Sequence, residues 1–125
     1  MRYDANEQPL PEAWLELDEG ERIDNVLDYH RRTKVKLDSP ELHAIAHVVV
    51  ENQVALGDAT AVPATLNRLM NEGLDRHDAI HAIASILMNV VFDGLQETDS
   101  SVEINARYGQ ELTKLTATGW RSQSE

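Results

Sequence analysis

The segment LDSPELHAIAHVVVENQVALG, residues 37–57, decides the fold class of this chain. Ser39 is a favourable N-cap, Pro40 suits the first turn of a helix, and Gly57 is a favourable residue just beyond a helix end. The residues between these signals are mostly aliphatic, and the run is too long for a typical strand. We therefore predict a helix that begins at Pro40 and ends near Leu56.

Start and stop signals of the same kind predict the helices that follow. Thr60 and Gly73 bracket a short helix, Asp75 caps a helix that continues to about Gln96, and Ser101 caps a weaker one. No segment shows sustained alternation of apolar and polar residues, which is the pattern of a half-buried strand. The predicted fold is all-α: a compact helical bundle of four to five helices, with two long central helices.

The chain has 125 residues, enough for one hydrophobic core. Residues 1–11 carry two prolines and no apolar period, so we expect an extended or disordered lead. Residues 12–120 form the predicted single helical domain, with a break near Gly20, and residues 121–125 form a loose polar tail.

The charge balance disfavours two classes of partner. Lys and Arg number 11 against 22 Asp and Glu, which gives a formal net charge of −11. Such a chain repels phosphate backbones and anionic lipid surfaces, so we expect no nucleic-acid binding and no membrane binding. The longest apolar stretch, residues 79–92, contains His81 and is too short to span a bilayer. The absence of cysteine fits a reducing compartment, so we expect a cytoplasmic location.

Two histidine pairs stand out within the two long helices. His43 and His47 lie four residues apart, as do His77 and His81, and Glu51 continues the first series. Residues four apart on a helix project from nearly the same face. If the two helices pack side by side, the pairs converge on one site, as in helical bundles that hold metal ions.

This pattern predicts binding of a divalent transition metal by His43, His47, His77 and His81, with Glu51 as a fifth ligand. Imidazole with one carboxylate suits zinc, nickel, iron or manganese, and the sequence does not choose among them. It does not establish whether the protein is an enzyme. In the alternative interpretation, His43 and His47 are solvated and His77 and His81 are hydrogen-bonded boundary residues.

Two other features invite a functional reading and do not support one. The motif HDAIH, residues 77–81, differs from the zinc-protease motif HExxH by Asp78, whose carboxylate is one methylene shorter than the glutamate that acts as base. Asp78 also has a structural role at a helix start. His30, beside two arginines near a helix end, is expected to be exposed.

Residues 42–92 resemble a family of small uncharacterised bacterial helical proteins, domain-of-unknown-function family 1841. The resemblance depends on HAIAHVVVENQ at residues 43–53, on HDAIH at residues 77–81, and on Leu66, Arg68, Leu69 and GLDR at residues 73–76. It covers under half of the chain. It implies a shared helical fold and a shared histidine pattern, and it carries no established activity.

A second hypothesis is a helical interaction module without chemistry. In the helix of residues 40–56, the expected core face consists of Leu42, Ile45, Val49 and Leu56. Further apolar surface is added by Val48, Val50 and Val54. Surplus aliphatic surface often marks a protein interface, so we predict a homodimer. The histidines would then lie in the dimer interface, where they would be structural or would make association depend on pH.

Overall fold

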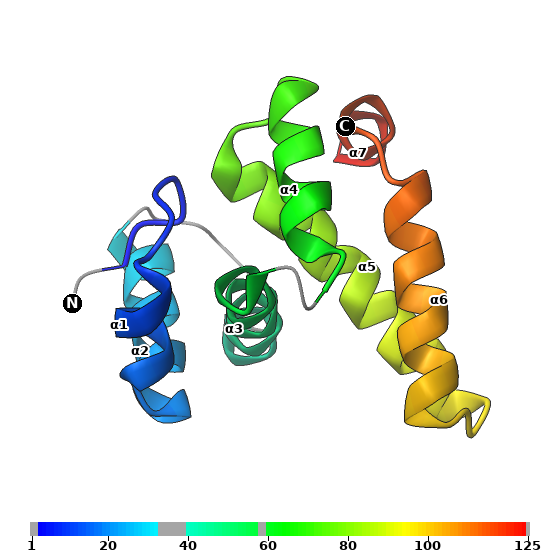
Figure 1. Ribbon diagram of the computed structural model, residues 1–125, viewed down its shortest axis with the longest axis horizontal. Helices are drawn as coiled ribbons and strands as arrows, with labels where there is room; N and C mark the ends of the chain where they lie inside the picture. The colour runs from blue at the N-terminus through cyan, green and yellow to red at the C-terminus, as the bar shows by residue number, and fades with distance from the viewer. Residues whose placement is uncertain (1–2, 33–39, 58–59, 125) are drawn as a thin grey trace.

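The fold of this protein is given by a computed structural model that describes residues 3–32, 40–57 and 60–124 (Figure 1). These residues form seven helices and no strand, so the predicted all-α class is confirmed. The described residues thus form two to three helices more than the four to five expected, because short helices occur at both ends. The helices are α1 (Pro11–Glu16), α2 (Glu19–Arg32), α3 (Pro40–Ala55), α4 (Val62–Asn71), α5 (Arg76–Gln96), α6 (Ser101–Lys114) and α7 (Ala117–Ser124).

Helix ends follow the predicted capping residues closely. Helix α3 begins at Pro40, while its expected cap, Ser39, lies outside the described residues. Asp75 caps α5 by accepting a hydrogen bond from the backbone N–H of Asp78 at 2.7 Å. The cap of α6 is Ser100, one residue before the predicted Ser101, because Ser100 and Glu103 complete a reciprocal capping box.

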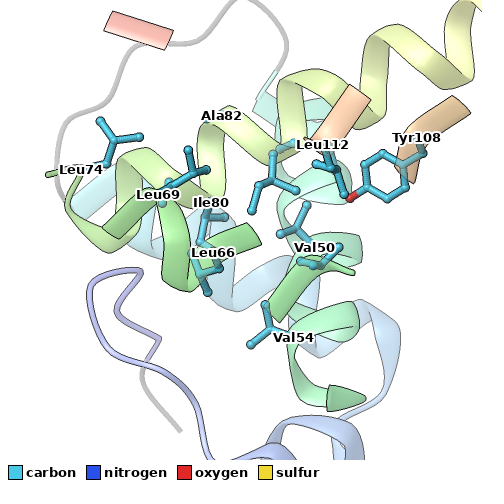
Figure 2. Packing of buried hydrophobic residues seen from close by; sticks show 14 of the residues in the cluster. Val50, Val54, Leu66, Leu69, Leu74, Ile80, Ala82, Tyr108 and Leu112 are labelled. Atoms are coloured by element: carbon cyan, nitrogen blue, oxygen red, sulfur yellow. The ribbon is translucent and has the colours of Figure 1, made fainter. Parts of the chain in front are cut away.

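Helix α3 lies in the middle of the molecule (Figure 1). Helices α1 and α2 pack on one side of it, and α4 and α5 pack on the other, with α6 beyond α5. Two buried hydrophobic clusters occupy the two sides. The larger joins side chains of α3 to those of α4, α5 and α6, among them Val50, Leu66, Ile80 and Leu112 (Figure 2). The smaller contains Tyr3, Ala5, Trp14, Val26, Tyr29, Ala44 and Val48.

The expected orientation of α3 is wrong. Leu42, Ile45 and Leu56, which were expected in the core, are 51%, 43% and 56% exposed. The face that carries His47 and Glu51 is buried instead. The reason is that α3 has neighbours on both sides, and they supply polar partners for its polar stripe.

Both ends of the chain are more ordered than expected. Tyr3 and Ala5 in the lead are buried. Arg32 donates a hydrogen bond to the Tyr3 carbonyl oxygen at 2.7 Å, and Arg76 donates one to the Ala5 carbonyl oxygen at 3.0 Å. The tail that was expected to be loose continues as α7 to Ser124.

Among the described residues, one helix, α5, is long and apolar enough to cross a membrane. The core helix of a water-soluble protein meets the same criteria, so length and composition alone do not assign it to a bilayer. In this molecule α5 packs against α3, α4 and α6. Its buried residues include Ile80 and Ile83.

Candidate metal centre

All five histidines of the chain meet where α2, α3 and α5 adjoin. Helix α2 supplies His30, α3 supplies His43 and His47, and α5 supplies His77 and His81. The two predicted pairs do converge, since the Nε2 atoms of His43 and His81 are 3.0 Å apart. The arrangement follows from the packing of α3 on α5, which brings the pair on each helix to the same level.

His30 is the main correction at this site. It was expected to be exposed, but it is 4% exposed and its Nε2 lies 3.2 Å from the Nε2 of His81. A usable signal was present in the sequence. His30 follows Ile23 and Val26 at helical spacing and therefore continues the apolar stripe of α2. We expected His30 to be exposed because the adjacent Arg31 and Arg32 suggested a solvated helix end.

The Nε2 atom of His81 is the centre of the cluster. The Nε2 atoms of His77, His43 and His30 lie 2.9, 3.0 and 3.2 Å from it. A ring nitrogen carries either one proton or one lone pair, so it forms one good hydrogen bond. Three such contacts at one nitrogen therefore cannot all be hydrogen bonds.

The same distances fit ligands that share one ion. With zinc–nitrogen bonds of about 2.0–2.1 Å, two ligating nitrogens are about 2.9 Å apart at right angles and about 3.4 Å apart in a tetrahedron. The nitrogen–nitrogen distances around His81, 2.9–3.2 Å, lie within that range. The buried histidine cluster is thus able to hold a metal ion.

Four of the five imidazoles bring ligand nitrogens close together. One ligand nitrogen from each of His30, His43, His47 and His81 lies within 4.8 Å of all the others. His77 is outside this set and contacts it through His81. His30 and His47 are buried, whereas His43, His77 and His81 are half-buried. An ion can therefore approach the cluster from the side of the half-buried rings.

The imidazoles of the cluster are neutral near pH 7. Burial and, to a smaller extent, the neighbouring imidazoles lower the pKa of His30 to about 4 and that of His81 to about 2. Burial also lowers the pKa values of His43 and His77, and it lowers that of His47 strongly. Neutral imidazole is the form that binds metals, so lone pairs are present without competition from protons.

Helix α2 fixes the tautomer of His30. Its Nδ1 lies 2.9 Å from the carbonyl oxygen of Val26, one turn earlier. A carbonyl oxygen only accepts, so Nδ1 carries the proton and Nε2 carries the lone pair. Nε2 is the atom that faces His81. A ligand imidazole held through its second nitrogen by a backbone carbonyl is common in metal sites.

Glu51 lies beside the cluster and has other partners. Arg76 binds both of its carboxylate oxygens, at 2.7 Å and 2.8 Å, and the Tyr3 hydroxyl donates to one of them. Glu51 is not a member of the four-nitrogen set. The geometry favours a supporting role for this carboxylate over the predicted role of fifth ligand.

Tyr3 and Arg76 are neighbours of the site that the sequence analysis missed. Arg76 occupies the first turn of α5, where the helix dipole disfavours a positive charge. An arginine at this unfavourable position indicates that a nearby acidic side chain compensates its positive charge. Tyr3 gave a weaker signal as an aromatic residue within a polar lead.

No family model, no curated protein and no solved structure matches this chain. The resemblance to family 1841 therefore stays a prediction.

Proposed function

We propose that this protein binds one divalent transition-metal ion through His30, His43, His47 and His81, with His77 beside them. The observation that carries the proposal is the set of three Nε2 atoms within 3.2 Å of the Nε2 of His81. Hydrogen bonding cannot account for all three contacts at one nitrogen, whereas a shared ion accounts for the contacts that His30 and His43 make with His81.

The ligand set narrows the choice of ion. The four nitrogen donors offer no carboxylate, because Glu51 is bound by Arg76. Nitrogen-only ligation suits zinc, nickel and ferrous iron better than manganese, which prefers oxygen ligands. We therefore expect zinc, nickel or iron, and we expect manganese to bind more weakly than these.

Elemental analysis of the purified protein tests the proposal. We expect close to one equivalent of metal per chain, and we expect chelator-treated protein to take up one equivalent of Zn²⁺ on titration. X-ray absorption of the loaded protein should show about four imidazoles around the ion. The double variant His43→Ala, His81→Ala should lose the ion.

The control is Tyr108→Phe, which removes a buried hydroxyl that donates to Gln53 at 2.8 Å on the other side of α3. It should retain the full equivalent of metal. Protein that takes up no Zn²⁺, Ni²⁺ or Fe²⁺ on titration would contradict the proposal. If the loaded site contains a carboxylate ligand, the proposed four-histidine ligand set is wrong and Glu51 is a ligand, as the sequence predicted.

We further propose that the chain forms a homodimer through an apolar face of α3 and α5. This face surrounds a hollow of about 490 Å³. Phe92 and Leu95 on α5 are 62% and 67% exposed beside it. The described residues that line the hollow are uncharged: Leu42, Ile45, Ala46, Val49, Leu87, Met88, Asn89, Val91, Phe92 and Leu95.

A second copy of the chain suits this face for two reasons. The chain has a net charge of −11, so two copies repel each other unless they meet where charges are absent. A twofold axis would also place the protruding Phe92 of each copy against the hollow of the other. The lining contains no histidine among the described residues, so a pH-sensitive histidine seam is not part of this proposal.

Sedimentation velocity tests the dimer. We expect a dimer for the unmodified protein and a monomer for Phe92→Glu, which places a charge on the apolar face. The matched control is Val102→Glu, because Val102 is 76% exposed on α6 and does not line the hollow. A monomer at all concentrations would contradict the proposal. Binding of the unmodified protein to lipid vesicles that Phe92→Glu abolishes would assign the face to a membrane instead.

The cytoplasm is the compartment that we propose for this function. Its support is the absence of cysteine, which is typical of proteins that fold in reducing surroundings.

A further inference from the structure

We infer that Tyr3 is a positioning residue of the metal site: it fixes His47 in the tautomer whose lone pair lies on Nδ1. This inference rests on the proposed function, because it names the atom through which His47 binds the ion. Its basis is a continuous chain of hydrogen bonds that runs from Arg76 through Glu51 and Tyr3 to His47.

The direction of each hydrogen bond follows from the available protons. Arg76 donates to both oxygens of Glu51, which requires the carboxylate to be the acceptor. The Tyr3 hydroxyl has one proton, and it donates that proton to Glu51. A tyrosine hydroxyl has an ordinary pKa of about 10, so it carries its proton at neutral pH.

The remaining contact of the hydroxyl then determines the tautomer of His47. The Tyr3 oxygen and His47 Nε2 are 2.7 Å apart, and the tyrosine proton is already used. His47 Nε2 must therefore carry a proton and donate it to Tyr3. The lone pair of the neutral ring is left on Nδ1.

Independent support comes from the environment of that Nδ1 atom. His47 is fully buried, and its Nδ1 has no hydrogen-bond partner among the described residues. A buried lone pair without a partner is unfavourable, and a metal ion would satisfy it. His47 also belongs to the set of four imidazoles whose ligand atoms lie within 4.8 Å of one another.

The consequence is that the N-terminal segment belongs to the metal site. Tyr3 lies outside every helix and is held there by the hydrogen bond from Arg32 to its carbonyl oxygen. Asn6, three residues later, accepts a hydrogen bond from the backbone N–H of His77 at 3.1 Å. If the N-terminal segment were displaced, His47 would lose the Tyr3 contact that selects its tautomer.

Long-range ¹H–¹⁵N NMR of the metal-free protein tests the tautomer directly. We expect His47 to be protonated at Nε2 in the unmodified protein. In Tyr3→Phe the acceptor is gone, and we expect a mixture of the two tautomers. A His47 protonated at Nδ1 in the unmodified protein would overturn the inference, whether or not metal binds.

Titration with Zn²⁺ tests the positioning role. Outer partners of ligand histidines commonly contribute 10–100-fold to metal affinity, so we expect a loss of that size for Tyr3→Phe. Tyr108→Phe is the matched control, since it also removes a buried hydroxyl bonded to a side-chain oxygen, and it should bind Zn²⁺ normally. Equal affinity of Tyr3→Phe and the unmodified protein would overturn the positioning role. If the unmodified protein binds no metal, the proposed function is wrong. The NMR measurement would still show whether the hydrogen bonds from Arg76 to His47 fix the tautomer of His47.

Discussion

At the scale of single residues, Arg76 and Glu51 form the most deeply buried ion pair among the described residues. The two side chains are 4% and 1% exposed, so each charge depends on the other for compensation. A buried charge that loses its partner is far more costly than the intact pair is favourable. Stability and site geometry therefore depend on the same two residues.

We predict that Arg76→Ala lowers the free energy of unfolding by about 3–5 kcal/mol, because Glu51 is left buried and uncompensated. Urea unfolding of metal-free protein measures the change. Arg107→Ala is the control, since Arg107 pairs with Glu97 and Asp99 at the surface, and its loss should be much smaller. Equal effects of the two substitutions would show that the buried pair is not compensating.

The sequence predicted four of the clustered histidines and missed the fifth. His43, His47, His77 and His81 were recognisable because helical spacing alone places each pair on one face. His30 was not recognised because its neighbours Arg31 and Arg32 suggested a solvated end. The partner of Glu51 was also beyond prediction, since the contact with Arg76 joins residues 25 positions apart through tertiary packing.

At the scale of helices, the packing of α6 on α5 depends on a glycine. A Cβ atom at Gly94 would lie 2.5 Å from Cγ1 of Ile104, which is closer than packed carbon atoms approach. Gly94 therefore marks a close contact between the two helices.

We predict that Gly94→Ala destabilises the protein by about 1–3 kcal/mol, because overpacking forces α6 away from α5. Gly109→Ala is the matched change in α6, where a Cβ would meet no atom within 4 Å. That substitution should stabilise the protein by about 0.5–1 kcal/mol, because alanine is the better helix former. Thermal unfolding of the two variants shows whether Gly94→Ala lowers the stability and Gly109→Ala raises it. A stabilising Gly94→Ala would contradict the close contact.

Helix boundaries were more predictable than helix orientation. Asp75 and Pro40 act through local backbone geometry, so their positions could be inferred from the sequence. The buried side of α3 could not, because nearly every side of this helix is apolar and its histidines looked like the solvated face. Only the positions of α2 and α5 reveal that the polar stripe is enclosed.

At the scale of the whole molecule, five neutral imidazoles in one place make folding sensitive to pH. The folded protein holds the pKa of His30 at about 4 and that of His81 at about 2, whereas an unfolded chain has histidine pKa values near 6.5. Between pH 4.5 and 6.5 the unfolded state therefore binds more protons than the folded state. Stability rises with pH across this window.

We predict that the metal-free protein loses stability as the pH falls from 7 to 5. Each histidine that stays neutral in the folded state contributes up to about 1.4 kcal/mol per pH unit. Urea unfolding in the presence of a chelator at pH 7, 6 and 5 measures the loss. Saturating Zn²⁺ at pH 7 should raise the unfolding temperature, because the ion binds only the folded cluster. Constant stability from pH 7 to 5 would contradict the enclosed, neutral cluster.

The anchoring of Tyr3 among these histidines has a practical consequence for anyone who produces the protein. A polyhistidine purification tag fused ahead of Met1 would bring extra imidazoles within a few residues of the cluster, where they could compete for the ion. Metal content measured on such a fusion would be ambiguous. Affinity handles belong after Glu125, or they should be removed by proteolysis before any titration.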